Sequence, residues 1–400
     1  MSMQDFIKVQ ASVVEQVDEI KRRNLADIVY GFAIRDRWKI KNALISSMRE
    51  NNKVESPQDW ELTYINIIPK ILRNLATIYE TPENIVYKVY SNNALNTDAS
   101  EKYTAFSKKI NKIKKQIHKL SIAHNTLVTF PKIINDNVYL DIIPPSMMSV
   151  ISNDENYLKM DGIILDIQLS DGTLGHKVIY SDKIVTVDYK WDIISSEDNI
   201  LGVIPAVVFR NEDGGDFWGC GLEEVVDINN KINTQLTSLA TAGLYQGGSL
   251  LFALNITDTG ILKVGPNSVI SVKEGNTSFS PSLEYKTPNP HVSEIIELIK
   301  FLISESLVMQ GLSANILTDT TNEQSGISKI VDSIEMKAIQ NSYKDAVIEY
   351  ETKLFTMWRL LFDNAKNNGN WSKELPFVGD YVEVEVIDAS NEVVSIEQVI

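Results

Sequence analysis

Apolar side chains recur at helical spacing along the first 80 residues of the chain. Two stripes carry the pattern, Val13, Val17 and Ile20 in the first and Ile67, Ile71, Leu75 and Ile78 in the second. Spacings of three or four residues place such side chains on one face of a helix. Thr81-Pro82 would stop the second helix, and the alternating Ile85–Tyr90 would follow it as a strand. The pattern predicts a mostly helical N-terminal region.

Between residues 126 and 210 the period changes to the alternation that is typical of half-buried strands. The predicted strands are Thr126–Phe130, Val138–Ile143, Gly162–Leu169, Lys177–Tyr180, Ile184–Tyr189 and Ala206–Phe209. The turn signals Asn135-Asp136-Asn137, Pro144-Pro145 and Asp171-Gly172 separate several of them. A β-rich half attached to a helical N-terminus indicates an α+β fold.

The order of elements after residue 220 is the most informative pattern. It predicts a helix over Gly221–Gly247, a small β-rich module over Gly248–Asn289 and a second helix over Pro290–Gly311. A polar loop, Leu312–Ser325, then leads into a long helical pattern and a final strand at Tyr381–Ile387. The β module is close to the lower limit for independent folding, so we expect it to need a partner copy. This order suits a protein that lines something better than one that encloses a small-molecule pocket.

A lysine-rich segment lies between residues 101 and 119. Its lysines are Lys102, Lys108, Lys109, Lys112, Lys114, Lys115 and Lys119, against the single acid Glu101. An apolar stripe at helical spacing, from Phe106 to Leu120, predicts one helix with the lysines mainly on its other faces. These lysines form either a solvated surface or a contact with DNA or with an acidic neighbouring subunit.

The 400-residue chain carries a net charge of −15, which changes the range of possible functions. Proteins that grip nucleic acid by counterion release normally carry the opposite balance, so a conventional DNA-binding protein is disfavoured. A conduit through which DNA slides is still compatible. The single cysteine, Cys220, excludes an intramolecular disulfide framework and fits a reducing compartment. Because the first ten residues lack signal-peptide features and no apolar run approaches 18 residues, we expect neither secretion nor a membrane span.

Sequence patterns of catalysis are absent. The four histidines, His118, His124, His176 and His291, lack metal-ligand spacing, and no nucleophile elbow, P-loop or dinucleotide fingerprint occurs. The glycine-rich Glu212–Gly221 precedes a helix and could cradle phosphate there. However, Glu223-Glu224 would oppose an anion, so the pattern favours a tight structural turn. We expect no catalytic residue, no metal and no cofactor; a nucleophilic Cys220 is the alternative to an inert small side chain.

An ordered set of segments resembles the portal proteins of tailed bacteriophages. Trp218-Gly219-Cys220-Gly221-Leu222, with Asp227, Asn229, Asn230 and Asn233 after it, resembles the entry into the family's stem helix. Lys263–Ile270 is similar to the Gly-Pro-Gly turn and strand of the family's clip, with Asn267 in place of the second glycine. Ile295–Ser313 resembles the second stem helix and its turn, and Gln324–Ser328 the step into the long helix. Arg73–Pro82 resembles the family's helix before a proline turn.

The resemblance implies an arrangement of domains. Residues 1–220 would form an α/β wing, completed by the long helix and C-terminal strand within 326–400. The two-helix stem would be 221–247 and 290–311, the β-rich clip 248–289 and the tunnel loop 312–325. The family's crown normally follows the long helix and a strand. Because this chain ends soon after Tyr381–Ile387, we expect a reduced or absent crown.

The resemblance also implies a function. The chain would form a ring, usually a dodecamer, at one capsid vertex of a virion that is assembled in the host cytoplasm. Double-stranded DNA would pass through the ring during packaging and ejection, with weak and non-specific contacts. The expected partners are the terminase large subunit, the major capsid or scaffold protein and a head-completion or tail adaptor protein, and no membrane is involved. The alternatives are another α+β virion or scaffold protein without a channel, and an enzyme with a carboxylate site.

Candidate channel-lining residues follow from this mapping. They are Thr318, Asp319, Thr320, Thr321, Asn322 and Glu323 in the tunnel loop, and Glu294, Glu297 and Glu305 in the stem. Rings of carboxylates would repel DNA from the walls, and short neutral side chains would bind it only weakly. Without the resemblance, the loop reads as an ordinary solvated loop. A closed ring needs a heterologous interface, to which the lysines of 101–119, Lys112, Lys114 and Lys115 among them, and the acidic segment 366–400 would contribute.

Overall fold

The computed structural model describes residues 11–52, 62–153, 155–246, 250–254, 282–286, 292–312 and 326–387. The chain divides into two compact units. Unit 1 comprises Met1–Ile40, Ile67–Val226 and Gly311–Ile400, and unit 2 comprises Lys41–Asn66 and Asp227–Gln310. Each unit is therefore built from segments that are distant in the sequence.

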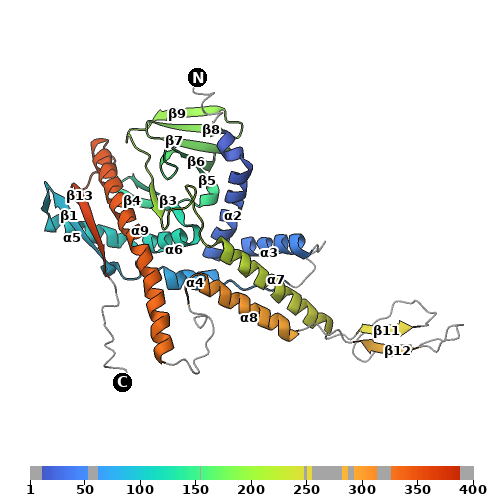
Figure 1. Cartoon of the computed structure of the whole chain (residues 1–400). Helices are drawn as coiled ribbons and strands as arrows, with labels where there is room; N and C mark the ends of the chain where they lie inside the picture. The colour runs from blue at the N-terminus through green and yellow to red at the C-terminus, as the bar shows by residue number, and fades with distance from the viewer. Residues whose placement is uncertain are drawn as a thin grey trace. The chain divides into compact units, whose positions relative to one another are not determined.

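The helices and strands can be followed by colour in Figure 1. The helices are α2 (Val17–Ile34), α3 (Arg37–Asn52), α4 (Ile68–Leu75), α5 (Thr97–Lys109), α6 (Asn111–His124), α7 (Glu223–Gln246), α8 (Val292–Val308) and α9 (Gly326–Asn367), with short 3-10 turns η2 (Pro82–Asn84) and η3 (Pro145–Met147). The strands are β1 (Ile85–Ser91), β2 (Ala94–Leu95), β3 (Thr126–Ile134), β4 (Asn137–Ile142), β5 (Met148–Ser152), β6 (Met160–Gln168), β7 (Leu174–Tyr180), β8 (Lys183–Asp188), β9 (Ile193–Asp198), β10 (Val207–Arg210), β11 (Leu250–Leu254), β12 (Ser282–Lys286) and β13 (Tyr381–Val386).

Unit 1 contains three antiparallel sheets, with strand orders β13-β1-β2, β10-β3-β4 and β5-β6-β7-β8-β9. The last is a simple meander, because each strand pairs with the next one in the chain. The C-terminal β13 pairs with β1 over six residue pairs, which closes the unit by joining its two ends. Helix α9 packs against β3, β10 and β13 and so connects two of the sheets.

The main core of unit 1 is aromatic. Tyr103 and Phe106 of α5 meet Phe355 and Trp358 of α9 in edge-to-face contacts with ring centroids 4.9 to 5.5 Å apart. Both faces of the five-stranded sheet are also buried: along β6, Ile163 and Leu165 join one apolar cluster while Ile164 joins another. This alternation is what the two-residue period of a strand requires.

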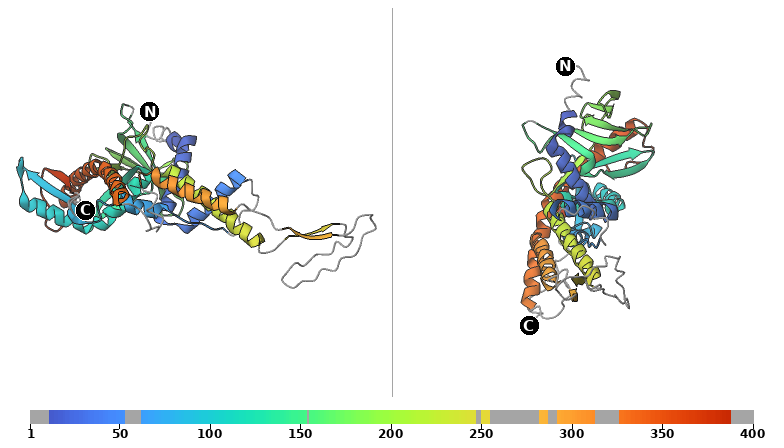
Figure 2. Two further views of the ribbon diagram at one scale, coloured as in Figure 1. Left: turned by 60° about the horizontal axis from the view of Figure 1, so that its bottom comes forward. Right: turned by 90° about the vertical axis from the view of Figure 1, so that its right-hand side faces the viewer.

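Unit 2 contains the antiparallel pair β11 and β12, in register from Leu250 opposite Lys286 to Leu254 opposite Ser282. Helices α7 and α8 lie alongside each other in Figure 1 and in both views of Figure 2. Within the described ranges, none of the helices combines the length and apolar character needed to cross a membrane.

The predicted α+β class is confirmed, and most predicted elements are found within a few residues of their expected bounds. The single helix predicted over 101–119 is wrong: the chain breaks at Ile110 into α5 and α6, which lets both helices turn apolar faces toward the core. Strands β5 and β9 were not predicted. The N-terminal stripe is also misassigned, since Val17 and Ile20 are exposed and α2 buries Val29 and Phe32 instead.

Candidate functional site

One side of α8 carries the glutamates that the sequence singled out. Glu294, Glu297 and Glu305 are separated by three and eight residues, and Phe301 and Val308 continue the same spacing. With 3.6 residues per turn, these five side chains lie on one face of the helix. That face is turned away from Ile299, Ser306 and Leu307, the buried residues of α8. Glu294 and Glu297 are exposed and Glu305 is half-buried.

The solvent-facing side of α8 is also unusually apolar. Phe301 and Val308 are 58% and 56% exposed, and Ile296, Leu298 and Met309 are exposed as well. Single exposed apolar residues need no explanation, but several on a short helix mark a contact surface. The surface that we call the α8 face, Glu294 to Met309, therefore combines carboxylates with apolar side chains that lack cover in one copy of the chain.

Helix α7 holds an extended segment with one row of polar side chains. Thr237 Oγ1 accepts from the Thr63 amide at 3.2 Å and donates to the Thr63 carbonyl at 3.0 Å. Asn233 Oδ1 accepts from the Ile65 amide at 2.9 Å, and Asn229 Nδ2 donates to the Ile65 carbonyl at 3.0 Å. Residues 229, 233 and 237 share a helix face, and they replace the partner strand that this backbone lacks. The Asn-bearing pattern of this helix thus has a structural role.

The other predicted channel residues, Thr318, Asp319, Thr320, Thr321, Asn322 and Glu323, lie outside the described residues, as does the centre of the β module with Lys263–Ile270. Their expected roles stay predictions.

The glycine-rich turn before α7 is a packing device. Asp216 Oδ1 accepts from the amides of Trp218 and Gly219 at 2.9 and 2.7 Å, and Leu222 donates to the Ala123 carbonyl at 2.9 Å. Glu223 accepts from the Gly221 amide. Because the chain's own oxygens take these donors, the turn offers no cradle for phosphate, as the interpretation as a structural turn predicts.

The lysine-rich segment is largely neutralised within the chain. Lys102 pairs with Asp98, Lys108 with Glu83, and Lys115 and Lys119 with Glu80. Lys114 is buried against Glu351 and is therefore not a surface residue, contrary to the expectation that grouped it with Lys112 and Lys115. Surface ion pairs of this kind contribute little to stability, but they reduce the charge available for an intersubunit contact.

The described histidines do not form a site. His118 and His124 are buried, and burial lowers the pKa of each to about 3, with small contributions from Lys119 and Arg22 respectively. His176 Nδ1 lies 3.1 Å from Asp166 Oδ1 and its ring stacks on Trp191. Cys220 is exposed, and partial burial and nearby carboxylates raise its thiol pKa, which disfavours the nucleophilic thiolate. Over the described part of the chain, no three His, Cys, Asp or Glu residues are grouped to hold a metal.

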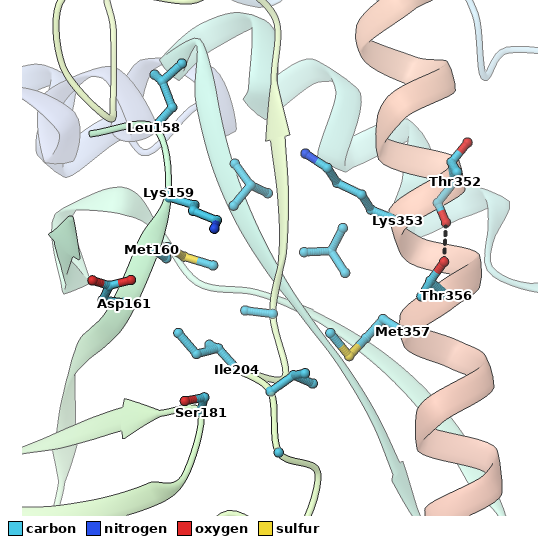
Figure 3. A pocket seen from close by; sticks show the side chains of 15 residues that line it. Leu158, Lys159, Met160, Asp161, Ser181, Ile204, Thr352, Lys353, Thr356 and Met357 are labelled. Carbon is cyan, nitrogen blue, oxygen red and sulfur yellow. Dashed lines mark hydrogen bonds between the residues drawn. The ribbon is translucent and has the colours of Figure 1, made fainter. Parts of the chain in front are cut away.

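A groove in unit 1 was not predicted from the sequence. Figure 3 shows its wider part, of about 860 Å³, between Lys159 and Met160 on one wall and Lys353 and Met357 of α9 on the other. A narrower part of about 350 Å³ shares Lys159, Lys353 and Val208 with it and extends to Asn211. Only an alternating strand over 206–209 signalled this place, because the groove forms between segments about 50 and 150 residues away.

The comparisons with known proteins give one kind of match. No family model matches the sequence, and no curated protein matches it. Among solved structures, a chain from the virion of a native gene transfer agent particle is similar over 88% of this chain and 84% of its own length, with 9% identity and a TM-score of 0.42. A likeness this low in identity and TM-score says nothing by itself about function.

Proposed function

We propose that this chain is the subunit of a portal-type ring, a non-enzymatic conduit for double-stranded DNA at one vertex of a phage-like virion. The observation that carries the proposal is the α8 face, where carboxylates and uncovered apolar side chains share one side of a helix. The order of α7, the β11–β12 pair, α8 and the long α9 supports it, because the sequence resemblance implies that order.

The two kinds of side chain on α8 have separate tasks in this proposal. Phe301 and Val308 would be covered by neighbouring copies, since burying apolar surface drives association. A ring requires that one surface of a subunit meet a different surface of the next. The neighbouring copies would bring Glu294, Glu297 and Glu305 together as rings of negative charge.

Negative rings would keep DNA from adhering to the channel. Each phosphate that a protein neutralises adds affinity through counterion release, and a conduit must avoid that gain. Contacts with DNA would accordingly be weak and non-specific. The ring would serve as the docking platform for a terminase large subunit, for capsid or scaffold protein and for a head-completion or tail adaptor protein.

The mass and shape of the purified chain test the proposal. Twelve copies of the 45.0 kDa chain give a particle of about 540 kDa, and negative-stain images should show a central hole. A compact two-fold dimer without a channel would instead favour a virion or scaffold protein of another kind. ATP hydrolysis by the purified chain alone would contradict the non-enzymatic role, because the motor should be a separate protein.

Variants of the α8 face test its role in assembly. Phe301→Glu with Val308→Glu should leave the chain monomeric at concentrations where the wild type forms rings. Val378→Glu is the matched control, since Val378 is 64% exposed but belongs to unit 1, and it should assemble normally. If the α8 variant forms wild-type rings, the face is not the subunit contact.

The glutamates are tested on assembled rings. Replacing Glu294, Glu297 and Glu305 together by Lys should convert weak DNA binding into tight binding with a steep dependence on salt. The Gln replacements remove the charge without reversing it and should produce a much smaller increase. Unchanged DNA affinity in the Lys variant would mean that these side chains do not face the channel.

A further inference from the structure

The groove of unit 1 runs along an unpaired strand edge. In the sheet β10-β3-β4, β10 pairs with β3 on one side and is the edge strand on the other. Val207 and Val208 of β10 line the wide part of the groove, and Val208 and Arg210 line the narrow part. The groove therefore follows β10 from end to end.

The pairing register shows which groups face the groove. Asn211 donates its amide to the carbonyl of Asn125, the residue opposite it, at 3.0 Å, so this is a hydrogen-bonded pair. Opposite pairs alternate in an antiparallel ladder, which makes Val207 and Phe209 bond to β3 and turns the backbone groups of Val208 and Arg210 outward. Over the described residues, no backbone partner is found for those outward groups.

Two side chains at the groove also lack partners. The side-chain amide of Asn211 is buried at both Nδ2 and Oδ1, and neither atom has a hydrogen bond within the described chain. Buried polar atoms of this kind are costly unless something pairs with them. Lys159 is exposed on the groove wall and makes no ion pair with the described residues. Its amine and that of Lys353 point toward the space between the two walls in Figure 3.

We propose that this groove, defined by β10, the 158–161 wall and α9, binds an extended segment of a partner protein that adds to β10 as a further strand. The partner segment carries apolar side chains around an acidic one. Its backbone pairs with Val208 and Arg210, its carboxylate lies between Lys159 and Lys353, and it satisfies the amide of Asn211. Addition of a strand to an exposed edge takes affinity from the main chain and specificity from alternate side chains.

The two walls fit this mode of binding. Successive side chains of a strand point to opposite faces, so one set would face Met357 on α9 and the other Met160 on β6. The lining residues of α9 run from Asp345 to Met357, roughly 18 Å of helix at 1.5 Å per residue. That length matches about five or six residues of extended chain at roughly 3.3 Å each. An edge left unprotected in this way is otherwise a liability for aggregation.

A peptide display selection against the full chain tests the proposal, with counter-selection against Lys159→Glu. The probes are random eight-residue peptides, and the enriched ones should alternate apolar residues around an Asp or Glu. Their affinity should fall at least tenfold for Lys159→Glu and stay unchanged for Lys109→Glu, an exposed lysine of α5 outside the groove. Enrichment of peptides without an acid, or binding that Lys159→Glu leaves intact, would overturn the proposal.

The backbone pairing has its own test. Methylating the amide nitrogens of the best peptide at alternate positions should abolish binding in one register and spare it in the other, because only alternate amides face β10. Equal effects in both registers would exclude strand addition. Val208→Pro removes only an outward amide, as edge strands tolerate, and should weaken binding without unfolding the chain.

The same experiment separates the possible occupants. If the wild-type chain associates with itself, and the selected peptide and Val208→Pro each abolish that association, the occupant is a second copy and a separate partner is excluded. The inference does not depend on the proposed ring, because a monomer with an intact groove should bind the peptide.

Discussion

Lys114 of α6 and Glu351 of α9, 237 residues apart in the chain, form an ion pair of 2.7 Å inside the aromatic core of unit 1. Their side chains are 1% and 0% exposed. The amine also donates to Ser107 Oγ at 2.8 Å and to Tyr87 Oη at 3.3 Å, and Tyr79 donates to the other carboxylate oxygen at 2.7 Å. Burial lowers the pKa of Lys114, and the carboxylate of Glu351 opposes that shift. The network joins α5, α6, α9 and β1 in one arrangement.

Removing one member of this pair should destabilise unit 1 strongly. Glu351→Leu leaves a buried ammonium group without its counter-charge, and we expect a loss of about 3–5 kcal/mol. The double variant Lys114→Met, Glu351→Leu should lose much less than the sum of the single variants, because no charge stays buried. Urea unfolding of the four proteins measures the coupling. Additive losses would show that the pair does not act as a unit.

The buried histidines should make the protein sensitive to mild acid. Their pKa is about 3 in the folded chain and about 6.5 when exposed, so below pH 6.5 the unfolded state binds protons that the folded state cannot. Stability is thus complete above pH 7 and falls as the pH drops from 6.5 toward 3. Between pH 7.5 and 5.5 each histidine should cost about 1.4 kcal/mol, which urea midpoints at several pH values can measure.

Replacing one histidine provides the control. His118 stacks on Phe209 and contacts Tyr79 edge-on, and neither of its ring nitrogens has a partner within the described chain. His118→Phe should therefore keep the packing and remove about half of the acid sensitivity over this pH window. A variant with the full wild-type slope would assign the sensitivity to other groups.

Gly219 should tolerate substitution worse than another glycine of similar backbone conformation. Its φ is +65°, and a Cβ there would collide with the side-chain amide of Asn125. That amide donates to the carbonyls of Glu212 and Trp218, so it cannot move freely. Gly369, at φ +72° with open space around it, isolates the backbone cost of about 1–2 kcal/mol. Thermal unfolding of Gly219→Ala and Gly369→Ala should show the larger loss for Gly219, and equal losses would refute the steric argument.

The polar row on α7 should control the protection of the segment it holds. Asn233→Ala removes the acceptor of the Ile65 amide, which should exchange with solvent at least tenfold faster. Lys231→Ala, an exposed position on the same helix, is the control and should leave that amide unchanged. Hydrogen exchange followed by mass spectrometry on peptides covering residues 62–66 makes the comparison. Unaltered exchange in Asn233→Ala would mean that other contacts hold the segment.

The sequence by itself determined the class of the fold and the main elements. Helical spacing identified α7, α8 and α9, and alternation identified β3, β4, β6, β7 and β8, because local burial patterns follow from the geometry of each element. The faces were predicted where a helix has one clearly apolar side: Ile71 and Leu75 of α4 are buried as expected. The exposed glutamates of α8 were identified for the same reason.

Tertiary structure decided which distant segments meet. Nothing in the spacing of Lys114 distinguishes it from Lys112 or Lys115, yet it alone of the three reaches Glu351 in the core. Similarly, the groove at β10 depends on a free strand edge, and strand order is a property of the assembled sheet. Periodicity reports how a residue lies on its own element, whereas partners, ion pairs and grooves arise only when elements from separate parts of the chain pack together.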